Sequence, residues 1–130
     1  PYLGHEQYGD EPEQSFNKFK EQDAWRNGFL LQTIKNAYKG LKQGKYGAFN
    51  VANVKSYKTF EEDTYDCMVE AGFKDIQVWW LSLSTQQGTK IQSTLEGTES
   101  EKKQSQNYIG RFARPDIPGR KYEPIFIGMK

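Results

Sequence analysis

The chain has 130 residues, a formal net charge of +1, 35% hydrophobic residues and 15% aromatic residues. This length fits one small domain, and the aromatic content excludes an intrinsically disordered chain, because such chains are poor in rings. Cys67 is the one cysteine, so an intrachain disulfide is excluded, and it is interpreted as a buried thiol. Short apolar runs and the lack of a secretory leader predict a cytoplasmic protein without membrane contact.

Residues 1–23 are predicted to form a loop. They show no sustained hydrophobic period and contain Gly4, Gly9 and Pro12, which are typical of turns. Four rings are expected to anchor this loop, namely Tyr2, Tyr8, Phe16 and Phe19. The loop holds six acidic residues against two lysines, and the only histidine, His5, is interpreted as a solvated side chain.

The next segment is predicted to form a helix that begins at Ala24 and is capped by Asp23. Its apolar positions are spaced by three, four or five residues, which is typical of one helical stripe. They are Trp25, Phe29, Leu30, Ile34, Ala37, Tyr38 and Leu41. Lys39 and Lys42 lie in the last turns, where the helix dipole favours cations, and Gly44 is the expected left-handed stop.

Residues 46–54 predict a strand. Both of its faces are mostly apolar, which is typical of a central strand covered by helices. Ligands of open α/β sheets bind at the carboxyl ends of strands, so Asn50 and Asn53, at the end of this strand, are candidates for a binding site. A turn-forming role is the alternative for Asn53.

A second helix is predicted after Thr59. Thr59 and Glu62 make a capping box, and the acidic residues 61–63 crowd the first turn, where the helix dipole favours negative charge. The helix is expected to end at Ala71, with Gly72 as its stop.

The remaining chain is predicted to contain two strands and a long polar segment. Residues 76–83 are rich in β-forming side chains, and residues 123–129 form the last strand. The segment between them, 85–122, is long for a loop, which indicates a functional or mobile region. Its second half carries six basic residues against one acid, namely Lys102, Lys103, Arg111, Arg114, Arg120 and Lys121. This pattern is typical of phosphate contact, and a solvated surface is the alternative.

The order of these elements is typical of half of an α/β sandwich with one sheet edge and one sheet face uncovered. The sequence contains no glycine-rich nucleotide-binding motif, no phosphate-binding loop and no zinc-binding motif. Motif spacing alone therefore predicts a soluble α/β unit and no particular reaction.

The opening from Pro1 to Ser15, with its Glu-x-Tyr and Gln-Ser, resembles the region just after the Pro-Pro-Tyr motif of S-adenosylmethionine-dependent DNA amino-methyltransferases. Similar pieces follow in the family's order: Trp25 with Phe29-Leu30, Leu41 to Tyr46 followed by Asn50-Val51, Glu70 to Phe73, and Tyr122 to Ile127. The likeness spans nearly the whole chain, with a gap over residues 86–120. The chain departs from the family at Lys45, Gln43 and the missing Asp/Asn/Ser-Pro before Pro1.

The resemblance implies a partial Rossmann-like methyltransferase fold of the α/β class, truncated before Pro1. It implies a three-stranded mixed sheet with flanking helices, whose last strand is antiparallel and lies between the other two. The single domain would comprise an active-site loop (1–23), a helix-strand-helix-strand unit (24–84), the polar and basic loop (85–122) and the final strand (123–130).

The truncation implied by the resemblance also predicts two partners. The missing N-terminal half would hold most of the cofactor, S-adenosylmethionine, so no methyl transfer is expected from this chain alone. Without that half, the first strand would expose an apolar edge that invites pairing with a second copy of the chain.

The resemblance further implies a site for a base that is flipped out of the nucleic acid. Pro1 and Tyr2 would be catalytic residues, because a proline carbonyl orients the amino group and the tyrosine ring stacks on the base; a core ring is the alternative for Tyr2. Four residues are expected to bind the substrate, namely Glu6, Tyr8, Asn50 and Asn53. The six basic residues would contact DNA, and no metal is expected.

Two other functions stay open at this point. The chain is alternatively a non-catalytic nucleic-acid-binding α/β module that uses its basic loop and exposed rings. It is alternatively a methyltransferase fragment that acts on RNA or protein, because relatives with those substrates share the Pro-Tyr opening.

Overall fold

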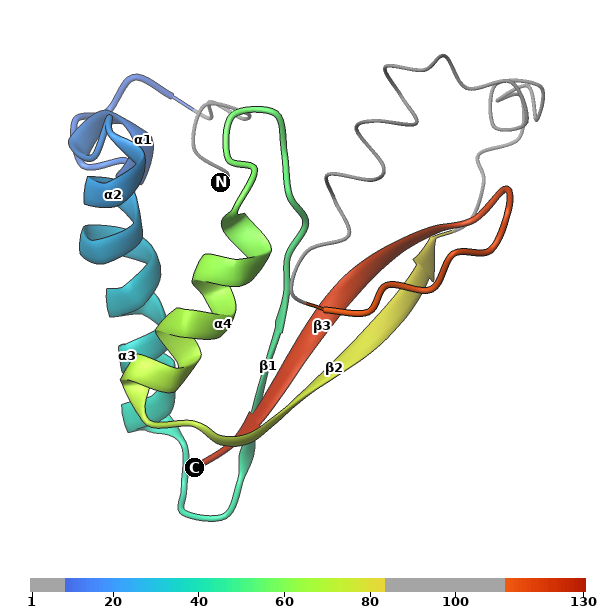
Figure 1. The fold of residues 1–130 in the computed structure, drawn as a ribbon. Coiled ribbons are helices and arrows are strands. Elements are labelled where there is room, and N and C mark those ends of the chain that lie inside the picture. Colours follow the sequence, from blue (N-terminus) through green and yellow to red (C-terminus); the bar gives the residue numbers. More distant parts are fainter. Residues whose placement is uncertain (1–8, 84–111) are drawn as a thin grey trace.

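The computed structural model describes residues 9–83 and 112–130. The helices are α1 (Ser15–Lys18), α2 (Gln22–Trp25), the π-helical turn η1 (Arg26–Leu30), α3 (Leu31–Gly40) and α4 (Phe60–Ala71). The strands are β1 (Tyr46–Asn50), β2 (Lys74–Leu83) and β3 (Lys121–Met129). Figure 1 shows the helices on one side of the sheet, with α4 between α3 and the strands. The chain is thus α/β, as predicted.

The first predicted helix is confirmed, although its ends differ from the prediction. Helix α2, η1 and α3 follow one another from Gln22 to Gly40, and Glu21 occupies the N-cap position, so Asp23 lies inside the first turn and does not cap it. The helix ends before Leu41, whose backbone is extended. Gly44 does have a positive φ of 75°, but it lies in the turn beyond the helix.

The apolar stripe of this helix builds much of the core, because Trp25, Leu30 and Ile34 are buried. The opening residues are not a loop throughout, since α1 forms there, and Phe16 and Phe19 pack against the core as predicted anchors. A Cβ on residue 28 would lie 2.3 Å from the Phe19 ring. Gly28 is therefore required for Phe19 to approach the helix backbone in η1.

The boundaries of α4 were predicted correctly, but its capping box was not. Thr59 occupies the N-cap without a side-chain cap hydrogen bond, because its hydroxyl donates to Asp63 Oδ2 at 3.2 Å instead. At the other end, Gly72 is left-handed with a φ of 106°, and its N–H donates to the carbonyl of Val69. Glycine adopts this conformation without the steric cost that a Cβ brings.

The sheet has the order β1-β3-β2, with β3 antiparallel to both neighbours. This agrees with the expectation that the last strand lies between the other two. The expectation of a mixed sheet was wrong, because β3 separates β1 from β2 and every pairing in the described residues is antiparallel. The central position predicted for β1 was also wrong: within the described residues β1 and β2 are both edge strands.

One face of the sheet packs against the helices. Phe126 of β3 is fully buried, and a Cβ on its neighbour Gly128 would lie 2.9 Å from the Cβ of Phe73. The space that Gly128 leaves is therefore filled by Phe73, which also contacts the Tyr38 ring of α3 at 5.1 Å between centroids.

The opposite face of the sheet is open within the described residues. Tyr46, Trp79 and Leu81 are 64%, 59% and 42% exposed there. Tyr46 and Trp79 pair with apolar residues of β3, Met129 and Ile125. Strand alternation explains the division, since neighbouring residues point to opposite faces. The uncovered face predicted from the sequence is therefore present.

Replacing Gly72 by alanine tests the helix end. An alanine there would have to keep the positive φ, and its Cβ would lie 3.2 Å from the Tyr38 ring. We therefore expect Gly72→Ala to lower the free energy of unfolding by about 1–2 kcal/mol. Gly40→Ala is the matched control, because its Cβ would meet no atom within 4 Å; it should leave stability equal or raise it by up to about 1 kcal/mol. Urea denaturation of both variants checks this, and equal stabilities would contradict it.

Candidate functional site at the carboxyl end of β1

Asn50 ties the end of β1 to the central strand. Its Nδ2 donates to the carbonyl of Pro124 at 3.0 Å, and the next backbone N–H, from Val51, donates to the same oxygen at 3.4 Å. The backbone of β3 thus fixes the last residue of β1. The predicted position of Asn50 at the carboxyl end of a strand is confirmed.

Asn53 joins the loop after β1 to the start of α4. Its Oδ1 accepts the backbone N–H of Glu61 at 2.9 Å, and its own N–H donates to Glu61 Oε1 at 3.2 Å. The first turn of a helix has N–H groups without intrahelical acceptors, and Asn53 satisfies one of them. The structure therefore gives Asn53 a helix-capping role, close to the turn-forming alternative.

Glu61 is the charged centre of this region. It is only 5% exposed, and its two carboxylate oxygens accept from Arg114 Nη2 at 2.8 and 2.7 Å. A carboxylate out of contact with water needs such a partner, because an unpaired buried charge is strongly unfavourable. Arg114 in turn lies over the Trp80 ring, 5.3 Å from its centroid, an attractive cation–π arrangement.

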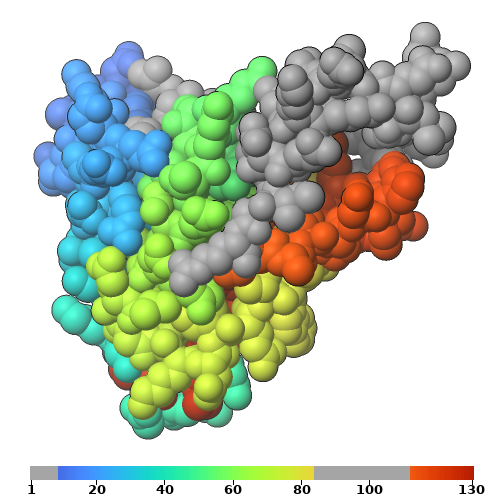
Figure 2. Space-filling view, viewed as in Figure 1, coloured from blue at the N-terminus to red at the C-terminus, as the bar shows by residue number. Residues whose placement is uncertain are grey.

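These contacts define the β1-end junction, whose members are Asn50, Asn53, Glu61, Trp80, Arg114 and Pro124. The junction connects β1, α4, β2, β3 and the segment before β3. In the space-filling view of Figure 2, α4 (green) lies between the N-terminal helices (blue) and that segment (orange). One polar atom in it, Arg114 Nε, is buried and has no hydrogen-bond partner among the described residues.

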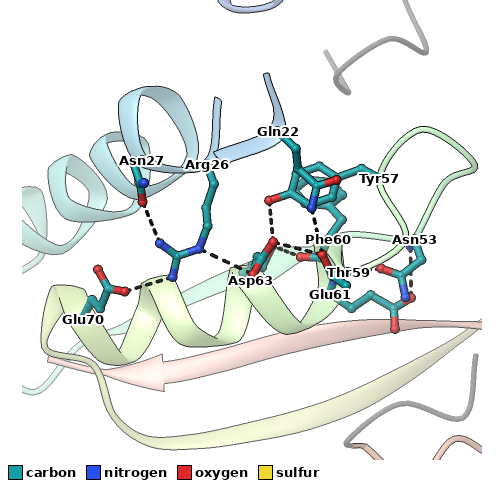
Figure 3. A network of polar contacts seen from close by, with 11 residues as sticks. Gln22, Arg26, Asn27, Asn53, Tyr57, Thr59, Phe60, Glu61, Asp63 and Glu70 are labelled. Carbon is teal, nitrogen blue, oxygen red and sulfur yellow. Dashed lines mark hydrogen bonds and ion pairs between the residues drawn. The ribbon is translucent and has the colours of Figure 1, made fainter. Parts of the chain in front are cut away.

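A second polar network lies where α2 and η1 cross α4, as Figure 3 shows. Arg26 Nη2 donates to Glu70 at 2.9 Å and Arg26 Nε lies 3.5 Å from Asp63. The Tyr57 hydroxyl donates to Asp63 Oδ2 at 2.6 Å, and Gln22 donates to Thr59 at 3.1 Å.

The electrostatics of this second network indicate a structural role. The hydrogen bond to Glu70 raises the pKa of Arg26, and burial, followed by the hydrogen bond to Asp63, raises the pKa of Tyr57 far above its ordinary value. Both groups therefore keep their protons at neutral pH and hold α4 against the N-terminal helices.

Cys67 is fully buried in α4, which confirms its interpretation as a packed thiol. Burial raises the pKa of Cys67 to about 11, so the thiolate needed for nucleophilic chemistry is scarce at neutral pH. Across residues 9–83 and 112–130, no group of three or more histidine, cysteine or carboxylate side chains is placed to hold a metal ion. No helix in these ranges is both long and apolar enough to cross a membrane.

The other predicted site residues divide into two groups. Seven lie outside the described residues: Pro1, Tyr2, Glu6, Tyr8, Lys102, Lys103 and Arg111. Arg120 and Lys121 lie at the start of β3, where Arg120 Nη1 donates to the hydroxyl of Ser82 at 3.3 Å and exposed Lys121 pairs with Leu83.

Asn53 and Arg114 thus meet at Glu61, whereas Asn50 contacts the Pro124 carbonyl. Sequence reasoning missed Glu61, Trp80 and Pro124 as members of the junction. Glu61 had been assigned only to the helix dipole, and Trp80 only to a strand. The one signal for Glu61 was an acidic residue directly after an apolar helix start, a place where burial is common.

Comparison with protein-family models, curated proteins and solved structures yields no match to this chain. The function is therefore argued from the residues, the topology and the junction.

The raised pKa of Cys67 predicts a loss of stability at high pH. In the unfolded chain the thiol ionises near its ordinary pKa of 9.0, whereas the folded chain keeps the proton until about 11. The contribution of the protonated thiol to the free energy of unfolding is complete below pH 9. It falls as the pH rises towards 11, by about 2–3 kcal/mol in total.

Urea denaturation of the wild type and of Cys67→Ala at pH 8 and at about pH 10.5 measures this effect. The alanine variant should be less stable at pH 8, because it leaves a cavity. Its further loss on raising the pH should be smaller than that of the wild type by about 2 kcal/mol. An identical pH dependence in both proteins would contradict the assignment.

Proposed function

We propose that this chain is the C-terminal part of an S-adenosylmethionine-dependent methyltransferase that modifies an exocyclic amino group of a base, in DNA. The supporting observation is the sheet: β1 and β2 run in the same direction on either side of the terminal strand β3, which is antiparallel to both. The resemblance implies this unusual insertion of the last strand. A partial Rossmann-like fold is proposed on the same ground.

The motifs that carry the resemblance fall on the corresponding elements. Leu41 to Lys45 makes the turn between α3 and β1, with Gly44 at positive φ. Glu70 to Phe73 covers the end of α4 and its left-handed glycine, and Tyr122 to Ile127 lies within β3. These three motifs, in this order along the chain, support the proposal more than any one of them alone.

The role proposed for this chain is to bind and orient the base. The proline carbonyl of residue 1 would accept an N–H of the amino group, and Tyr2 would stack on the ring, which places the nitrogen lone pair in line for reaction. Glu6, Tyr8, Asn50 and Asn53 are proposed to border the base pocket, since ligands bind at the carboxyl ends of strands.

The cofactor is assigned to the missing N-terminal half. When bound, S-adenosylmethionine would supply the methyl group. In the β1-end junction Glu61 and Arg114 neutralise each other at 2.7 Å, so neither charge fits the amino or carboxylate group of the cofactor.

A nucleic-acid-binding module without catalysis is the second candidate. The observation in its favour is that the β2–β3 pair carries exposed cations, Arg120 and Lys121, at one end and an exposed ring, the 59% exposed Trp79, further along β2, opposite Ile125. The same elements would serve a methyltransferase that acts on RNA or on protein.

Methyl transfer separates these candidates. This chain alone, with S-adenosylmethionine and DNA, should transfer no label, and the longer protein that includes the sequence before Pro1 should transfer it. In the longer protein, Tyr2→Ala should lower the rate about 5- to 150-fold, the equivalent of one lost base stack, while Tyr2→Phe keeps the ring and the rate.

Two results would overturn the proposal. One is turnover by the chain alone, and the other is an upstream sequence without Asp, Asn or Ser followed by proline. A protein that binds DNA under both conditions but never methylates it would support the second candidate.

We also propose that two copies pair through the outer edge of β1. The N–H of Val51 and the carbonyl of Lys45 form hydrogen bonds with the β3 side. Because the backbone N–H and C=O groups of successive residues point to alternate sides of a strand, those of Tyr46, Ala48 and Asn50 point away from β3, to the outer edge. The edge contains no charged residue and no proline, the usual protections against pairing.

Sedimentation velocity tests this pairing. We expect a dimer or larger species for the wild type and a monomer for Ala48→Pro, which removes one outward N–H but no bond to β3. Ala48→Val is the control and should assemble like the wild type. A monomeric wild type at all concentrations would count against the proposal.

A further inference from the structure

The segment before β3 is held to the rest of the molecule at two points by its side chains. The ring of Phe112 packs against Tyr65 and Phe126 at 5.2 and 5.1 Å between centroids. Arg114 reaches both Glu61 of α4 and Trp80 of β2. Phe112 contributes apolar contact, whereas Arg114 contributes an ion pair with Glu61 of α4.

Glu61 holds two different segments with one carboxylate. Its Oε1 accepts from the Asn53 backbone N–H and from Arg114 Nη2. The loop after β1 and the segment before β3 are therefore fixed relative to each other through one nearly inaccessible side chain. Loss of Arg114 would leave that carboxylate buried without its cation, which is unfavourable.

From this geometry we infer that Glu61 and Arg114 form a clasp that positions residues 112–120 against the carboxyl end of β1, and that Arg114 is a positioning residue and not a phosphate ligand. The inference rests on the proposed nucleic-acid function and says which basic residues contact phosphate and which one positions the segment. It alters the role expected from the sequence, in which all six basic residues contact DNA.

Of the six basic residues predicted to contact DNA, Arg120 and Lys121 are then the phosphate ligands among the described residues. Arg120 donates to the neutral Ser82 hydroxyl, and Lys121 is exposed at the first position of β3. Neither has a carboxylate partner in the described residues, whereas the charge of Arg114 is neutralised at 2.7 Å. A neutralised guanidinium attracts a phosphate far less than a free one.

Salt-dependent DNA binding distinguishes a positioning residue from a phosphate ligand. Each phosphate contact adds about 0.9 to the slope of log affinity against log salt. Arg120→Gln and Lys121→Gln should therefore each lower that slope by about 0.9. Arg114→Gln should weaken binding by about 2- to 30-fold with the slope unchanged.

Glu61→Gln gives the sharpest contrast, because the two roles predict opposite signs. If Arg114 is a positioning residue, Glu61→Gln lowers the affinity for DNA as Arg114→Gln does. The double variant then has the same affinity as the single variant with the lower affinity. If Arg114 is a phosphate ligand, removal of the competing carboxylate strengthens binding. Stronger binding by Glu61→Gln, or a slope lowered by Arg114→Gln, would overturn the inference.

Hydrogen exchange without DNA tests the clasp separately from the proposed function. In Glu61→Gln and Arg114→Gln, the Asn53 amide and the amides of residues 112–120 should exchange at least about tenfold faster, while Phe126 in the core exchanges as before. Arg120→Gln is the matched control and should change neither.

The two experiments fail in different ways. A wild-type chain that binds no nucleic acid refutes the proposed function and the assigned phosphate ligands, and the clasp is then judged by exchange alone. Unchanged exchange in both Arg114→Gln and Glu61→Gln overturns the clasp itself.

Discussion

Burial of α4 between the N-terminal helices and the sheet is the constraint on which the rest of the structure depends. Thr64, Cys67 and Met68 on this helix are completely buried, and the Thr64 hydroxyl donates to the Phe60 carbonyl within the helix. Every other element packs directly or indirectly on α4. A small chain buries little area beyond one such layer, and within residues 9–83 and 112–130 nothing covers the opposite face of the three strands.

A helix buried on several sides brings its charged residues into places with little water, and the structure neutralises them with arginine from other elements. Arg26 pairs with Asp63 and Glu70 on the side of the N-terminal helices, and Arg114 pairs with Glu61 on the side of the sheet. Arginine suits this task because its planar donors meet carboxylates in fixed directions and it keeps its charge. These pairs specify how the elements dock, whatever their net contribution to stability.

The same arrangement places the candidate function at the rim of the molecule. The carboxyl end of β1 is organised by the hydrogen bonds of Asn50 and Asn53. Chemistry that depends on orientation, such as presenting a base amino group, is compatible with this arrangement, and so is plain nucleic-acid binding.

The sequence by itself determined the elements, because their signals are local: the apolar stripe from Trp25 to Leu41, the left-handed stop at Gly72 and the β-forming run before Leu83. It also indicated, through the resemblance, that the last strand lies between the other two. The tertiary fold alone showed that Arg114 pairs with Glu61, 53 residues away in sequence. Partners so distant leave no spacing to recognise, and a charge pattern states how many cations a segment has but not which carboxylate each one meets.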